Sequence, residues 1–189
     1  MHKDRSQRDY RDFSPAQKQH KHLPHLDIKN HYQFITFRTH DSVDVYLTKL
    51  TQKALPNRQK QQLMDEYLDQ STSGAVLNDA ALVLLTELIK SHDSVLYELF
   101  AFCIMPNHVH LLIKPLIELD KLIHKLKGRS AKLINESLGT AGRFWAADYY
   151  DKLIRDEKHF SVVYRYIKNN PLVLGEAEAS VPRFYGVYE

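Results

Sequence analysis

The sequence has little of three things: cysteine, long apolar runs and net charge. Cys103 is the one cysteine and cannot form an internal disulfide, which excludes the disulfide-stapled class of secreted domains. The longest apolar run, residues 99–105, is far shorter than the roughly 20 residues that cross a bilayer. The first residues, Met1-His2-Lys3-Asp4, lack the apolar core of a signal peptide. We therefore expect no membrane span and a cytoplasmic location.

The composition is otherwise that of an ordinary globular chain. Of its 189 residues, 43% are hydrophobic and 26% are charged, which excludes collagen-like and disordered classes. The formal net charge of +3 is weak evidence for a polyanionic partner. Eleven histidines and eleven tyrosines are more informative, because both side chains carry chemistry. The length suits one domain: we expect a polar arm over 1–30, a folded domain over 31–175 and an irregular tail over 176–189.

Apolar periodicity and turn residues predict the order of elements. Strands are predicted at 32–38, 95–105, 109–114 and 144–154, and helices at 44–55, 58–69, 77–89, 116–138 and 157–170. Met105-Pro106-Asn107 predicts a tight turn between the two central strands, since proline cannot donate to a ladder. The order predicts an α+β fold, a ferredoxin-like or RRM-like antiparallel sheet with helices packed mainly on one face.

The helix at 116–138 has one apolar face, and much of the rest is basic. The candidate nucleic-acid-binding residues are Lys121, Lys125, Lys127, Arg129 and Lys132. A solvated helix face is the alternative interpretation of the same lysines.

His108-Val109-His110 lies on the predicted returning strand. Strand side chains alternate between faces, so the two histidine side chains point the same way, with their Cα atoms about 6 to 7 Å apart. Two imidazoles at that separation can converge on one divalent metal, while Val109 packs under a helix. A chance His-x-His pair is about equally compatible with a chain that has eleven histidines.

Tyr166 and Asn170 lie one turn apart on the last predicted helix, and therefore on one face. A phenol can act as a covalent nucleophile, and an amide oxygen can ligate a hard metal. Tyr164 points some 160 to 200° away from Tyr166, so only one of the two tyrosines can face a metal. For a tyrosine taken alone, amphipathic packing is the alternative role.

Together these motifs resemble a known family. The stretch Met-Pro-Asn-His-Val-His-Leu-Leu at 105–112 resembles the hallmark of the single-tyrosine HUH transposases, in which two histidines flank a hydrophobic residue. Tyr-Ile-Lys-Asn-Asn-Pro at 166–171 resembles the nucleophile helix of their REP-associated tyrosine transposase branch. Segments 34–38, 127–132 and 144–156 resemble that branch as well, each in the expected place along the chain. The resemblance covers roughly residues 30–175.

The resemblance implies a metal-dependent endonuclease and strand transferase acting on single-stranded DNA. It implies His108, His110 and Asn170 as ligands of Mg²⁺ or Mn²⁺, and Tyr166 as the nucleophile that leaves a 5′-phosphotyrosine and a free 3′-hydroxyl. The implied substrate is a hairpin with an unpaired flank, within bacterial nucleoid DNA. Relatives include dimers and monomers, so the oligomeric state stays open between monomer and homodimer.

Two other functions fit parts of the sequence. The same sheet with exposed aromatic residues could bind single-stranded nucleic acid without chemistry, by stacking bases. His108 and His110 could also belong to a zinc hydrolase, although no third strong ligand is evident near them.

Overall fold

The computed structural model describes residues 17–19, 24–26, 30–42, 45–175 and 181–188. A five-stranded antiparallel sheet forms its centre, in the order β6-β3-β5-β4-β7. The strands are β3 (Gln33–Arg38), β4 (Tyr97–Ile104), β5 (His108–Pro115), β6 (Tyr150–Leu153) and β7 (Phe184–Gly186). The helices are α1 (Val45–Gln52), α2 (Asn57–Gln70), α3 (Asp79–Ser91), α4 (Leu119–Leu138) and α5 (Glu157–Asn169). Two 3-10 turns, η1 (His40–Ser42) and η2 (Asn170–Leu174), follow β3 and α5.

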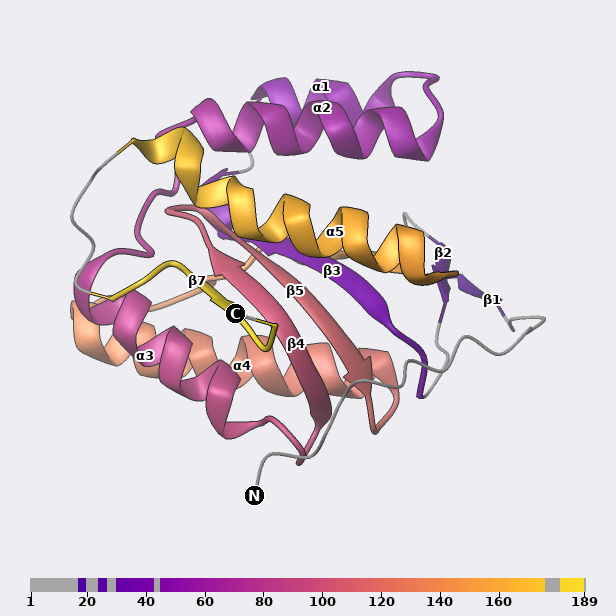
Figure 1. The fold of residues 1–189 in the computed structure, drawn as a ribbon. Helices are drawn as coiled ribbons and strands as arrows, with labels where there is room; N and C mark the ends of the chain where they lie inside the picture. Colours follow the sequence, from indigo (N-terminus) through magenta and orange to yellow (C-terminus); the bar gives the residue numbers. More distant parts are fainter. Residues whose placement is uncertain (1–16, 20–23, 27–29, 43–44, 176–180, 189) are drawn as a thin grey trace.

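The topology confirms the predicted ferredoxin-like α+β fold. Helix α3 connects β3 to β4, and α4 connects β5 to β6, so that two β-α-β units interleave in one sheet. Both helices lie on the same face of the sheet (Figure 1), where they bury apolar side chains of alternate strand positions such as Ile35, Val109 and Leu111. The sheet is the predicted one, but the prediction that the helices pack mainly on one face was wrong, because helices cover both faces of the sheet.

Helix α5 covers the opposite face of the sheet (Figure 1). Its buried residues Phe160, Val163 and Ile167 pack against the other set of strand side chains, including Phe34 and Leu112. Asp156 caps this helix as predicted, because its carboxylate accepts a hydrogen bond from the backbone N–H of His159 at 2.7 Å. The face under α5 carries the candidate chemistry.

Helices α1 and α2 pack on each other through Leu50, Met64 and Leu68 and lie beyond α5 (Figure 1). The side chain of Asn107, in the turn between β4 and β5, holds the end of α2. Its amide nitrogen donates to the carbonyl oxygens of Leu68, Ser71 and Ser73 at 3.0 to 3.3 Å. This contact fixes α2 beside the His-Val-His strand.

Two sequence predictions about strands were wrong in part. The strand predicted over 144–154 is limited to β6, because residues 146–148 form a loop whose three carbonyl oxygens accept hydrogen bonds from Lys127. The region beyond 181 was predicted to be irregular, yet β7 pairs with β4. Strand β7 is three residues long, too short for an alternating pattern to be recognised. Within the predicted arm, β1 (Gln17–Gln19) and β2 (Pro24–Leu26) form a two-stranded sheet, and the rest of 1–29 lies outside the described residues.

Gly186 lets β7 approach α5, and we expect Gly186→Ala to destabilise the protein by about 1 to 3 kcal/mol. An added Cβ would collide with the hydroxyl of Tyr164 and lie 2.7 Å from the ring of Phe184. Removing the hydroxyl relieves part of this overlap, so Tyr164→Phe should partly rescue Gly186→Ala. Urea unfolding of the two single variants and the double variant measures the coupling, and additive losses would contradict the contact.

Candidate active site

The alternation of β5 places the two histidines under α5. His108 and His110 are fully buried on this face, while Val109 joins the core under α3 and α4. Their Nε2 atoms face each other at 3.1 Å. The structure therefore brings the predicted pair together, as the spacing of two residues on a strand requires.

Asn107 fixes the tautomer of His108. Three backbone carbonyl oxygens surround the Asn107 amide nitrogen, so the amide oxygen must be the atom 2.7 Å from His108 Nδ1. An amide oxygen only accepts, and Nδ1 of His108 must therefore carry the proton. In the neutral ring, Nε2 of His108 then has a free lone pair directed into the site.

His110 is held by its strand neighbours. Its Nδ1 lies 2.8 Å from the hydroxyl of Thr36, the residue paired with it on β3. Its ring stacks on Phe34 with centroids 5.4 Å apart. A threonine hydroxyl can donate or accept, so Thr36 supports either tautomer of His110.

Burial keeps both histidines neutral. Desolvation, with a smaller contribution from the nearby charge of Arg38, lowers the pKa of His108 to about 3. Desolvation also lowers the pKa of His110, with a further contribution from His108. Neutral imidazole is the form that ligates a metal.

Tyr166 reaches this pair from α5. Its hydroxyl lies 3.4 Å from His110 Nε2, and the two rings are edge-to-face with centroids 5.2 Å apart. Burial raises the pKa of the Tyr166 phenol well above its usual value, and so do the charges of Asp65 and Asp69 and a hydrogen bond with Asp65. The phenol is thus protonated in the resting site.

Tyr164 lies on the other side of α5, as the helical geometry predicts. Its hydroxyl accepts a hydrogen bond from the backbone N–H of Tyr188, and its ring packs edge-to-face on Phe184 and Tyr188. The two tyrosines therefore occupy different environments, one at the histidines and one against the C-terminal strand.

Asn170 is buried at the junction of α5 and η2. Its side-chain oxygen has no hydrogen-bond partner. Asn170, Tyr166 and Asp69 line one open pocket of about 380 Å³. An unpartnered buried oxygen in that position is a chemically suitable donor for a cation.

The sequence reasoning missed the carboxylates of α2. Asp65 hydrogen-bonds with Tyr166, and Asp69 Oδ1 lies 3.4 Å from His108 Nε2. Burial, with a contribution from Glu66, raises the pKa of Asp69 to about 6. The one sequence signal was their spacing of four residues, which puts both on one face of a helix. Nothing in the sequence indicated that this face turns toward β5.

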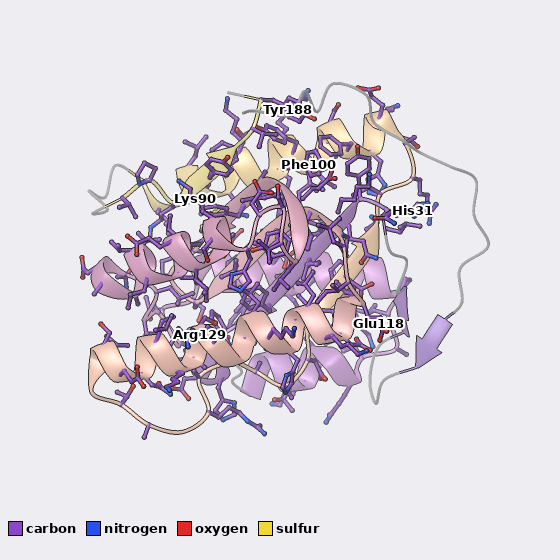
Figure 2. All side chains as sticks on the ribbon, turned by 90° about the horizontal axis from the view of Figure 1, so that it is seen from below. His31, Lys90, Phe100, Glu118, Arg129 and Tyr188 are labelled. Carbon is purple, nitrogen blue, oxygen red and sulfur yellow. The ribbon has the colours of Figure 1, made fainter. Side chains whose placement is uncertain are left out.

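The candidate nucleic-acid-binding residues lie on α4, on the face of the sheet opposite to the histidines. Four of them are exposed, namely Lys121, Lys125, Arg129 and Lys132. Figure 2 looks onto α4, with Arg129 labelled on it. Lys127 differs, because its ammonium donates to the carbonyl oxygens of residues 146–148. It stabilises a loop, and burial lowers its pKa to about 8.

A positively charged side chain that is not among the predicted site residues, Arg38, lies beside the histidines. Arg38 pairs with His108 across β3 and β5, so its side chain is on the same face of the sheet. Its Nε is buried without a hydrogen-bond partner. Sequence reasoning did not single out Arg38, because one arginine at the end of a strand carries no pattern.

In the part of the chain that the structure describes, no three or more His, Cys, Asp or Glu side chains form a ready-made metal cluster. No described helix is long and apolar enough to cross a bilayer.

Because His108 and His110 are buried in the neutral form, we expect the free energy of unfolding of the protein to depend on pH. A chelator in the buffer keeps the protein free of metal during this measurement. The folded pKa of His108 lies below the unfolded value near 6.5, so the unfolded chain binds more protons between pH 6.5 and about 3. The stabilisation is complete above pH 6.5 and falls with decreasing pH by about 1.4 kcal/mol per pH unit for each such proton. Urea midpoints at pH 7 and pH 5 measure it, and the His108→Gln/His110→Gln variant should show a flatter profile. Parallel profiles would contradict the assignment.

The chain is similar to several known proteins. A curated protein of Haemophilus influenzae, described as uncharacterized, is 30% identical over 95 residues, covering 38% of this chain and 53% of that protein. This chain thus matches about half the length of that relative. The structure of a REP-associated tyrosine transposase bound to a REP hairpin is 19% identical with a TM-score of 0.47, covering 81% of this chain and 73% of the other. A candidate transposase of Deinococcus radiodurans is 17% identical with a TM-score of 0.44, covering 81% and 96%.

A family model gives the clearest match. The model described as IS200-like transposase matches residues 60–170. That range is more than half of the chain and runs from α2 through the His-Val-His strand to Asn170. The chain therefore belongs to the family of IS200-like transposases.

Proposed function

We propose that the protein is a divalent-metal-dependent endonuclease and strand transferase for single-stranded DNA, of the REP-associated type, with residues 31–175 as its catalytic domain. The observation that carries the proposal is the position of the Tyr166 hydroxyl, 3.4 Å from Nε2 of His110. A nucleophile and a pair of metal-ligating nitrogens share one buried site. We propose that Tyr166 forms a 5′-phosphotyrosine intermediate.

The residues present fit a divalent cation. Two neutral imidazoles direct Nε2 atoms at each other, and the unpartnered oxygen of Asn170 lies at the neighbouring pocket. His108, His110 and Asn170 would hold Mg²⁺ or Mn²⁺. When bound, such a cation supplies Lewis-acid polarisation of a phosphoryl oxygen.

Tyr166 performs the covalent step. Its phenolic oxygen forms a bond to the phosphorus of the DNA backbone, and the bond from phosphorus to the 3′ oxygen breaks. The phenolic proton passes to Asp65, which already hydrogen-bonds with the hydroxyl, and the departing 3′ oxygen takes a proton from solvent. The products are a 5′-phosphotyrosine and a free 3′-hydroxyl.

A covalent intermediate explains why tyrosine is used. The phosphotyrosine diester retains the energy of the broken phosphodiester, so another 3′-hydroxyl can attack it without ATP. Transfer to a different 3′-hydroxyl is the strand-transfer half of a transposition reaction. Arg38, next to His108 on the same face, is a cation available to the backbone phosphate.

We propose a DNA hairpin with an unpaired flank as the substrate, within bacterial nucleoid DNA in the cytoplasm. The flank would enter the open pocket that Asp69, Tyr166 and Asn170 line. The exposed basic residues of α4 lie on the other face, so they contact a separate part of the DNA. Two separated contact regions suit a branched substrate better than a short linear strand. A single subunit holds His108, His110 and Tyr166 together, so one copy suffices for the proposed chemistry.

Tyr166→Phe should bind single-stranded DNA normally and form no covalent adduct. Phenylalanine keeps the ring packing on Phe34 and His110 but removes the attacking oxygen. The assay is a denaturing gel of labelled DNA incubated with protein and Mn²⁺. Tyr164→Phe is the matched control, because it removes a hydroxyl from the same helix on the other side and should retain the adduct. An adduct in Tyr166→Phe that is absent in Tyr164→Phe would reverse the assignment.

Removal of either histidine should abolish cleavage with the fold retained. His108→Ala and His110→Ala each remove one Nε2 from the facing pair, so metal-dependent cleavage should become undetectable, a loss of at least roughly 10² to 10³-fold. Circular dichroism checks the fold of each variant. Undiminished Mg²⁺-dependent cleavage in both variants would refute the metal assignment.

Binding should prefer a hairpin with a single-stranded tail over blunt duplex and should weaken with salt. Phosphate contacts release counterions, so log K falls with log salt by about 0.7 for each phosphate contacted on a single strand. Replacing Arg129 with Gln should reduce that slope, because its charge is exposed on α4. Fluorescence anisotropy over a salt series measures both effects, and equal affinity for the two DNAs would contradict the substrate.

A further inference from the structure

We propose that Asp69 of α2 supplies a carboxylate ligand to the divalent cation held by His108 and His110. The inference rests on the proposed function, since it concerns the metal of that same site. It adds one carboxylate to the proposed site of two histidines and one neutral amide.

The distances between donor atoms fit a shared cation. Asp69 Oδ1 lies 3.4 Å from His108 Nε2, which lies 3.1 Å from His110 Nε2. Ligands bound at about 2.1 Å are about 3.0 Å apart in an octahedral sphere and about 3.4 Å apart in a tetrahedral one. Both observed separations fall in this range.

Asp69 Oδ1 and His108 Nε2 face each other with no proton between them. Asn107 holds the proton of His108 on Nδ1, so Nε2 presents a lone pair. Asp69 Oδ1 is buried without a hydrogen-bond partner. A carboxylate oxygen opposite a bare ring nitrogen is repulsive, and a cation between them satisfies both atoms.

Charge favours the carboxylate over the amide. Two imidazoles and the amide of Asn170 are neutral and do not offset a double positive charge in a buried site. Mg²⁺ is typically bound through one or two carboxylates, and two histidines with one carboxylate hold divalent metals while leaving positions open. Asp69 would therefore contribute most of the preference for a hard cation.

The fold explains how a residue of α2 reaches β5. The amide nitrogen of Asn107 binds the carbonyl of Leu68, the residue before Asp69, while its oxygen binds His108. One side chain thus sets the position of both proposed ligands. The described residues contain no preformed three-ligand cluster of His, Cys, Asp or Glu, so the proposal requires the Asp69 side chain to shift toward the two histidines.

The test is a titration of the full chain with Mn²⁺ alone, followed by electron paramagnetic resonance of the free ion. We expect Asp69→Asn to weaken Mn²⁺ binding at least tenfold. Glu66→Gln is the matched control, because Glu66 is an exposed carboxylate of the same helix that accepts a hydrogen bond from Gln62. It removes the same charge and should change the affinity by less than threefold. Circular dichroism checks that both variants are folded.

Three results overturn the inference. Equal Mn²⁺ affinity in Asp69→Asn and the unmodified protein, with binding lost in His108→Ala, rejects Asp69 and leaves the proposed function intact. An equal loss in Asp69→Asn and Glu66→Gln shows a general charge effect and no ligation. Absence of Mn²⁺ binding by the unmodified protein rejects both the inference and the proposed metal site.

Discussion

The side chain of Asn107 is the contact on which the rest of the site depends. Its nitrogen donates to three carbonyl oxygens at the end of α2, and its oxygen accepts from Nδ1 of His108. The first set of bonds places α2, and with it Asp65 and Asp69, beside the sheet. The last bond directs the lone pair of His108 Nε2 toward His110. One buried amide thus couples the placement of a helix to the tautomer of a histidine.

Burial sets the charge state of the site around this contact. It lowers the pKa of both histidines and raises the pKa of Tyr166, so the rings are neutral and the phenol is protonated. A protonated phenol is a weak nucleophile, and the lone pair of His108 Nε2 faces the carboxylate of Asp69 with no proton between them. The resting site is therefore incomplete by itself, and the binding of a cation and of a phosphate supplies the charges that it lacks.

Part of this arrangement was predictable from the sequence. Strand alternation predicted that His108 and His110 share a face, and helical geometry separated Tyr166 from Tyr164; the structure has both. The order of elements predicted the ferredoxin-like sheet. The other features of the site depend on tertiary packing. No local pattern shows that α2 turns Asp65 and Asp69 toward β5 or that α4 lies on the face away from the histidines. No local pattern shows either that Lys127 binds carbonyl oxygens of a loop. Such facts depend on contacts between residues distant in sequence.

The central claim is that Tyr166 becomes covalently joined to DNA through a 5′ phosphate. The most direct measurement is mass spectrometry of the protein after incubation with a cognate hairpin and Mn²⁺, nuclease trimming and proteolysis. We expect one modified peptide, with a nucleotide joined through its 5′ phosphate to Tyr166, and a released strand that ends in a 3′-hydroxyl. Attachment to Tyr164, or a released strand that ends in a 3′ phosphate, would contradict it.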